Sequence, residues 1–129
     1  MMSYYLSKML SVSFDDAITR ATDALNKEGF GILTEIDVSA TLKKKIGVDF
    51  PNYRILGACN PALAYEALRL ENKVGTMLPC NVVIRDVGNG QTEVAAIDPV
   101  ASMQAIDNPA LKQAAAQVRT KLEKVIAEL

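Results

Sequence analysis

Hydrophobic and polar positions in the first half of the chain follow strand spacing and helix spacing in turn. Aromatic and apolar residues over 4–11 predict a first strand. Ser13 is a good helix cap, and the apolar residues after it recur at helical spacing up to Gly29, so a helix is predicted between them. Alternation over 32–38 predicts a half-buried antiparallel strand with Ile32, Ile36 and Val38 on one face.

The second half repeats these signals. Residues 39–46 predict a short helix that ends at Gly47, and residues 53–59 predict a strand. Asn60 followed by Pro61 predicts a helix start, because asparagine caps free amide groups and proline tolerates the first turn. This helix runs to about residue 72. Residues 79–87 and 92–97 predict a hairpin across the tight turn at 88–90, and Asn108 followed by Pro109 begins a long final helix.

The order of these elements predicts an α+β fold. Two long helices and about five strands predict a mainly antiparallel sheet with helices on one face and short helices inserted between the strands. With 129 residues, 50% of them hydrophobic, and no linker or repeat, one domain over residues 1–129 is expected. Both faces of the strand around Val82, Val83 and Ile84 are apolar, so a homodimer or an apolar ligand is expected to cover the second face.

Composition removes several classes of function. With 14 basic and 15 acidic side chains there is no net attraction to polyanions, so no nucleic acid partner is expected. Apolar runs are too short for a membrane span, and the opening residues do not form a signal peptide, so we expect a cytoplasmic protein with reduced thiols. The chain has no histidine, which excludes histidine-based triads and zinc proteases. An enzyme that uses Cys59 as nucleophile is the least favoured class, since it lacks a histidine base.

The most distinctive feature is a Cys-Asn pair that occurs twice beside a proline, at Cys59-Asn60-Pro61 and Pro79-Cys80-Asn81. Cys59 precedes a predicted helix N-terminus, whose dipole favours a thiolate. The plainer interpretation is that both cysteines are core residues on apolar strand faces. Their exposure decides between these interpretations.

A joint site at Cys59 and Cys80 has open alternatives. The spacing is not a zinc pattern, but the thiols can bind a soft metal such as Zn²⁺ or Cu(I) with further ligands. Met9, Met77 and Met103 are candidate thioether ligands, although core filling is their more common use. If the strands around the intervening helix are parallel, the cysteines are too far apart for a disulfide, and an antiparallel arrangement removes that objection.

The segment Ile55-Leu56-Gly57-Ala58-Cys59-Asn60-Pro61, the later Leu78-Pro79-Cys80-Asn81-Val82-Val83 and Asp98-Pro99 together resemble the domain of unknown function 302 family over nearly the whole chain. The resemblance implies a small TATA-box-binding-protein-like α+β fold, with a strand, a helix, four strands and a helix, usually as a homodimer. The helix after Pro61 is then an insertion. The family has no established activity. The resemblance implies that any shared site is surrounded by Cys59, Asn60, Pro61, Pro79, Cys80, Asn81 and Asp98.

Two functions are therefore expected candidates. The first is a cytoplasmic, homodimeric module that binds a small apolar or anionic ligand near the two motifs, with polar contacts from Asn60 and Asn81. The alternative is a redox or soft-metal protein that uses Cys59 and Cys80. No cofactor is assigned.

Overall fold

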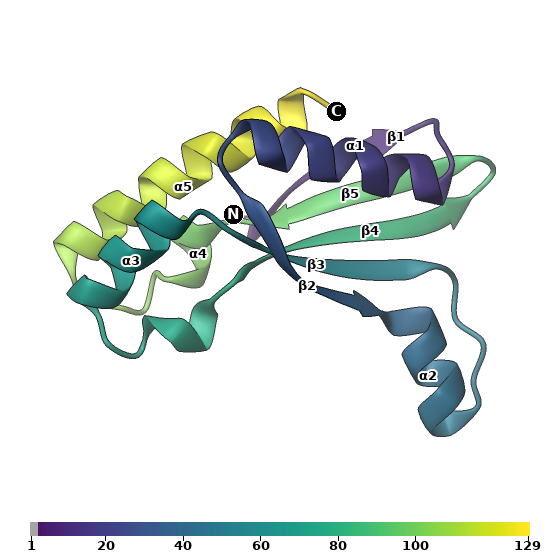
Figure 1. Cartoon of the computed structure of the whole chain (residues 1–129), viewed down its shortest axis with the longest axis horizontal. Helices are drawn as coiled ribbons and strands as arrows, with labels where there is room; N and C mark the ends of the chain where they lie inside the picture. Colours follow the sequence, from purple (N-terminus) through teal and green to yellow (C-terminus); the bar gives the residue numbers. More distant parts are fainter. Residues whose placement is uncertain (1–2) are drawn as a thin grey trace.

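A computed structural model describes residues 3–129 as an α+β fold around one five-stranded antiparallel sheet (Figure 1). The strands lie in the order β1-β5-β4-β3-β2. The elements along the chain are β1 (Tyr5–Leu10), α1 (Phe14–Lys27), β2 (Gly31–Asp37), α2 (Val38–Ile46), β3 (Tyr53–Cys59), α3 (Pro61–Leu70), the 3₁₀ helix η1 (Val74–Met77), β4 (Cys80–Gly88), β5 (Gln91–Ile97), α4 (Pro99–Ser102) and α5 (Pro109–Ala127). The strands and the two long helices, α1 and α5, follow the plan of a strand, a helix, four strands and a helix.

The predicted helix caps and turn are confirmed. The Ser13 side chain accepts a hydrogen bond from the amide of Asp16 at 3.2 Å, and Asn60 and Asn108 cap α3 and α5 in the same way. These oxygens pair with amide groups that the first helical turn leaves free. In the β4–β5 hairpin, Asn89 has a φ of 56°, between two glycines that also have positive φ. Local sequence chemistry therefore defines most element boundaries.

The prediction for β2 is wrong in two respects. The register of β2 against β3 shifts between Ile32 and Thr34, so Ile32 and Ile36 lie on opposite faces of the sheet. Ile36 is 47% exposed. The bulge inserts one residue and inverts the alternation after it, on an edge strand where a bulge disturbs few neighbours. Val38 is not in the strand, because Asp37 caps α2 through a 2.9 Å hydrogen bond from the amide of Ala40.

Two apolar clusters hold the fold together. The larger one packs α1 and α5 against one face of the sheet, with Leu25, Leu56, Val82, Ile84, Val94 and Leu122 among its buried members. The smaller one joins α3, η1 and α4 to the first half of α5, and its buried members are Ala67, Val74, Met103, Leu111 and Ala115. In Figure 1 the elements of the smaller cluster lie beyond one end of the sheet. The long helix α5 therefore connects the two clusters.

The second face of the sheet has no helix over it in the part of the chain that the structure describes. We call it the open face, defined by Tyr5, Tyr53, Val83, Ala95 and Ile97. Next to Val83 and Ala95 on this surface, Arg85 Nε donates to Glu93 Oε1 at 2.6 Å. The ring of Phe50 lies 6.0 Å from that of Tyr53 and extends the apolar surface toward α2. The second apolar face expected from the sequence is thus present.

A close approach of three chain segments accounts for Gly57 in β3. A Cβ atom at this position would overlap Thr34 Oγ1 and lie 2.7 Å from Cγ of Pro79. We expect Gly57→Ala to lower the free energy of unfolding by about 2 kcal/mol, the usual cost of overpacking. Urea unfolding measures this change. Gly31→Ala is the matched control in the neighbouring strand, because nothing lies within 4 Å of its added Cβ. Equal stability of the two variants would contradict the close packing at Gly57.

Candidate functional site

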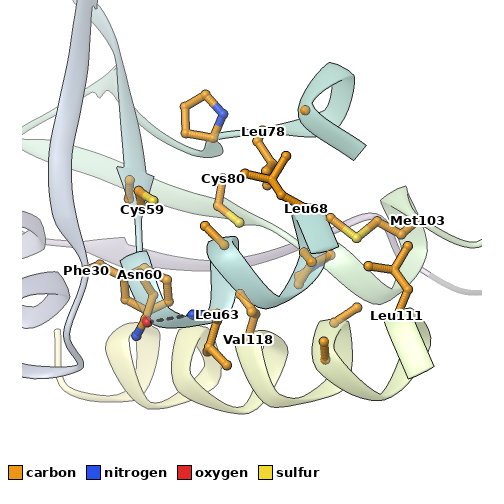
Figure 2. Close-up of a pocket in the computed structure, with 18 of the residues that line it drawn as sticks. Phe30, Cys59, Asn60, Leu63, Leu68, Leu78, Cys80, Met103, Leu111 and Val118 are labelled. Carbon is orange, nitrogen blue, oxygen red and sulfur yellow. Dashed lines mark hydrogen bonds between the residues drawn. The ribbon is translucent and has the colours of Figure 1, made fainter. Parts of the chain in front are cut away.

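A cavity of about 350 Å³ opens beside the ends of β3 and β4, between α3 and α5 (Figure 2). Both predicted motifs border it, through Cys59, Asn60, Pro79 and Cys80. None of the side chains that line it carries a charge. Its volume lies within the range of small-molecule binding pockets.

The cavity exists because facing helices present small side chains to each other. Ala64 and Ala67 of α3 face the space opposite Ala114 and Ala115 of α5. An alanine on a core-facing position of a helix leaves room that a leucine would fill. The space therefore lies between the two apolar clusters and remains unfilled by either.

The cavity has buried walls and an apolar mouth. Phe30, Leu111 and Ala115 line it, and each is buried. Leu33 and Leu68 line the outer part and are 65% and 46% exposed. Leu33 takes this position because it lies at the β2 bulge. A molecule that enters from solvent therefore meets hydrocarbon at the mouth as well as inside.

The two cysteines lie at the ends of adjacent antiparallel strands. Cys80, the first residue of β4, pairs in register with Ala58, so Cys59 lies one residue beyond the direct partner. Both thiols are free, and both line the cavity. In this antiparallel arrangement the two cysteines are not too far apart for a disulfide, since Cα atoms at this offset are roughly 6 Å apart. Both side chains reach the same cavity at these strand ends, where the strict alternation of a pleated strand no longer separates them.

The environments of the two thiols differ. Cys59 is half-buried, whereas Cys80 is buried. Burial raises the pKa of the Cys80 thiol from 9.0 to about 11, and the neighbouring Cys59 adds to the rise. A buried thiolate is disfavoured because the apolar surroundings do not solvate its charge. Cys80 is therefore a neutral thiol at neutral pH and a poor nucleophile.

Asn60 and the prolines mainly shape the site. Asn60 Oδ1 accepts a hydrogen bond from the amide of Leu63 at 3.3 Å, which fixes the start of α3 at the cavity wall (Figure 2). Pro61 occupies the first turn of α3, is exposed and does not line the cavity. Pro79 lines the cavity and follows a cis peptide bond.

The structure does not bring Asn81 and Asp98 to the cavity. Asn81 is exposed and borders the open face, because it is the next residue along the strand from the inward-facing Cys80. Asp98 is 3% exposed and caps α4, accepting from the amide of Val100 at 2.9 Å. Its second oxygen accepts from Arg119 Nε at 3.0 Å. Charge-assisted bonds of this kind stabilise a buried carboxylate, so Asp98 joins α4 to α5.

Sequence reasoning missed much of the cavity wall. Phe30 follows the turn after α1, and Leu78 precedes a strand, so neither signals a ligand site in sequence. The alanines of α5 give no such signal either, because small residues are equally typical of a closely packed helix surface. Of the three methionines considered as sulfur ligands, Met103 lines the cavity, whereas Met9 and Met77 do not. Within residues 3–129 no three His, Cys, Asp or Glu side chains gather to hold a metal, and no helix is long and apolar enough to cross a membrane.

Comparison with known proteins places the chain among proteins without an assigned activity. A family model described as "Domain of unknown function DUF302" matches residues 6–129. The chain is similar to a crystal structure titled "uncharacterized conserved protein DUF302 from Bacillus stearothermophilus", with 30% identity and a TM-score of 0.90 over 98% of each chain. No curated protein matches.

The raised pKa of Cys80 predicts a pH effect on stability. Between pH 9 and about 11 the unfolded chain loses the Cys80 proton while the folded chain keeps it. The free energy of unfolding therefore falls as the pH rises through this range, by about 2–3 kcal/mol. Urea unfolding across this pH range measures the fall in the free energy of unfolding. Cys80→Ala has no thiol at this position, so we expect it to lack the part of the fall that Cys80 causes. Cys59→Ala is the control and keeps most of the effect. The same loss in wild type and Cys80→Ala would show that folding does not desolvate this thiol.

Proposed function

Since the chain belongs to the DUF302 family, whose description names no activity, we propose its function from its own cavity: it binds a small, uncharged, apolar molecule between α3 and α5. One observation carries the proposal. The cavity of about 350 Å³ is lined without a single charged side chain and opens to solvent through apolar residues. Preformed apolar pockets of this size are typical ligand sites.

The lining favours a neutral ligand over an anionic one. No lysine or arginine reaches the cavity, and the Asn60 oxygen is already engaged in capping α3. Moving an unpaired charge from water into such surroundings is costly. The ligand is therefore held by its shape and by the removal of its hydrocarbon surface from water.

The observations do not favour a redox pair as a second function. Cys59 lies one residue beyond the register partner of Cys80, and the high pKa of Cys80 keeps its thiol protonated. Thiol–disulfide exchange requires a thiolate and a reachable partner sulfur. The two thiols are instead part of the wall of a binding space.

We further propose that the module is a homodimer whose copies meet at the open face. Val83, Ala95 and Ile97 form an apolar centre there, and Phe50 continues it beyond the sheet. The acid and base of the Arg85–Glu93 pair give this face no net charge. A second copy of this face therefore meets no net charge of its own sign. The absence of net charge and the apolar centre support a second copy as the occupant.

Filling the cavity tests the binding proposal. We expect N-phenyl-1-naphthylamine, an uncharged probe that fluoresces in apolar surroundings, to bind the wild type, and Ala115→Leu to weaken binding at least about tenfold. Ala116→Leu makes the same change one residue along α5, at an exposed position, and is expected to bind the probe normally. Ala64→Leu, on α3, is a second filling variant if Ala115→Leu does not fold. Equal binding by the filling variants and Ala116→Leu would place the probe elsewhere.

A charged substitution on the open face tests the homodimer. Sedimentation velocity is expected to show a dimer for the wild type and a monomer for Val83→Arg, because two unpaired arginines would be buried at the interface. Tyr65→Arg, at an exposed position of α3 away from this face, is expected to stay dimeric. A monomeric wild type, or a dimeric Val83→Arg, would contradict this interface.

A further inference from the structure

The short helix α2 and the turn after it expose apolar residues that no core contact explains. None of the residues of α2 is buried, and its main neighbours are the edge strand β2 and the adjacent β3. Figure 1 shows α2 extending beyond the sheet, away from α1 and α5. We call residues 43–49 the α2 tip, because they form the last turn of α2 and the turn that begins at Gly47. Ile46 and Val48 are large, exposed apolar residues of the tip.

The charge of the α2 tip differs from that of the rest of the protein. Lys43, Lys44 and Lys45 follow one another, and Asp49 is the single acid in the tip. Lys43 pairs with Asp49 at 2.9 Å, whereas Lys44 and Lys45 are exposed and make no ion pair within residues 3–129. Three lysines and one aspartate give the tip a net charge of +2, so the rest of a chain with a total of −1 carries −3. The weakly acidic protein therefore has one basic projection.

We propose that the α2 tip binds the surface of an anionic phospholipid membrane. Lysines attract the anionic headgroups, and apolar side chains beside them enter the boundary between headgroups and acyl chains. Taken singly, an exposed hydrophobic residue is ordinary, and a lysine at a helix C-terminus is favoured by the helix dipole. The tip combines the lysines with Ile46 and Val48 on a projecting part of the fold, and so supplies both interactions at one place.

Polar contacts hold the α2 tip in position without covering it. The Asp37 side chain caps the first turn of α2, and Ser39 Oγ donates to the carbonyl of Phe50 at 2.8 Å. Gly47 ends the helix with a φ of 71°, and its amide donates to the carbonyl of Lys43 at 3.0 Å. The backbone of the tip is therefore already ordered, which lowers the entropic cost of binding.

The combination of charge and apolar surface favours a membrane over other partners. A nucleic acid or an acidic protein surface would use the lysines but leave Ile46 and Val48 without a partner. A second copy of the tip would cover the apolar side chains but bring two positive charges of the same size together. The tip includes no residue of the cavity between α3 and α5 or of the open face, so this inference is independent of both proposals above.

Vesicle co-sedimentation tests the contribution of charge. We expect the wild type to bind vesicles of phosphatidylcholine with about 30% phosphatidylserine, to bind pure phosphatidylcholine vesicles much more weakly, and to bind less as salt is raised. The double variant Lys44→Glu, Lys45→Glu should weaken binding to the anionic vesicles at least about 20-fold, because each lysine at such a surface contributes about fivefold. The double variant Lys112→Glu, Lys124→Glu makes the same change in net charge at exposed positions of α5 and is expected to bind as the wild type does.

Tryptophan emission tests the insertion of the apolar side chains. The chain has no tryptophan, so Ile46→Trp introduces a single reporter at the tip. We expect its emission to shift to shorter wavelength when the anionic vesicles are added, as the indole moves from water into the membrane interface. Tyr65→Trp, which replaces a similarly exposed side chain on α3, is the control and should show no shift.

Several outcomes would overturn the proposal. They are a wild type that does not distinguish anionic from neutral vesicles, equal weakening by the two double variants, and unchanged emission of Ile46→Trp. If the wild type binds no vesicles and Lys44→Glu, Lys45→Glu changes the oligomeric state in sedimentation velocity, the tip contacts a second copy of the chain and the membrane proposal is rejected.

Discussion

The pairing of β3 with β4 is the constraint on which the rest of the structure depends. Because Ala58 lies opposite Cys80, the last residues of β3 and the first residues of β4 meet at the same end of the sheet. The chain between them must leave the sheet and return, and it does so as α3 and η1. The segment formed by α3 and η1 packs on the first half of α5, while the second half of α5 packs on the sheet. A space remains where the two packing regions meet.

Much of the fold could be predicted from the sequence, because the signals that define it are local. Ser13, Asn60 and Asn108 each satisfy amide groups a few residues away, and the residues at 88–90 specify a turn by their own backbone preferences. The bulge in β2 has no such signal. Its alternation looks regular in sequence, and only pairing with β3 shows that Ile32 and Ile36 face opposite ways.

The site was predictable only in part, because residues that are neighbours in the sequence do not always line the same cavity. Cys59, Asn60 and Cys80 were identified as a group, and the structure places all three at one cavity. Asn81 was grouped with them by adjacency, but a strand sends successive side chains to opposite faces. Asp98 was grouped with them by the family resemblance of Asp98-Pro99, but its side chain caps α4 and pairs with Arg119 of α5. Proximity along the chain did not distinguish residues that line the cavity from residues that build the scaffold.

The motif residues accordingly divide into two kinds. Gly57, Pro61 and Asp98 are explained by close approach, helix initiation and capping, without any ligand. The cavity wall, by contrast, is made mostly of hydrocarbon side chains, with alanines at four facing helix positions. Each of those alanines is a single substitution away from valine, a change that removes about two methyl groups' worth of space. The size of the ligand that the cavity accepts can therefore change in small steps during evolution. The helix caps, the Asp98–Arg119 ion pair and the strand register stay as they are.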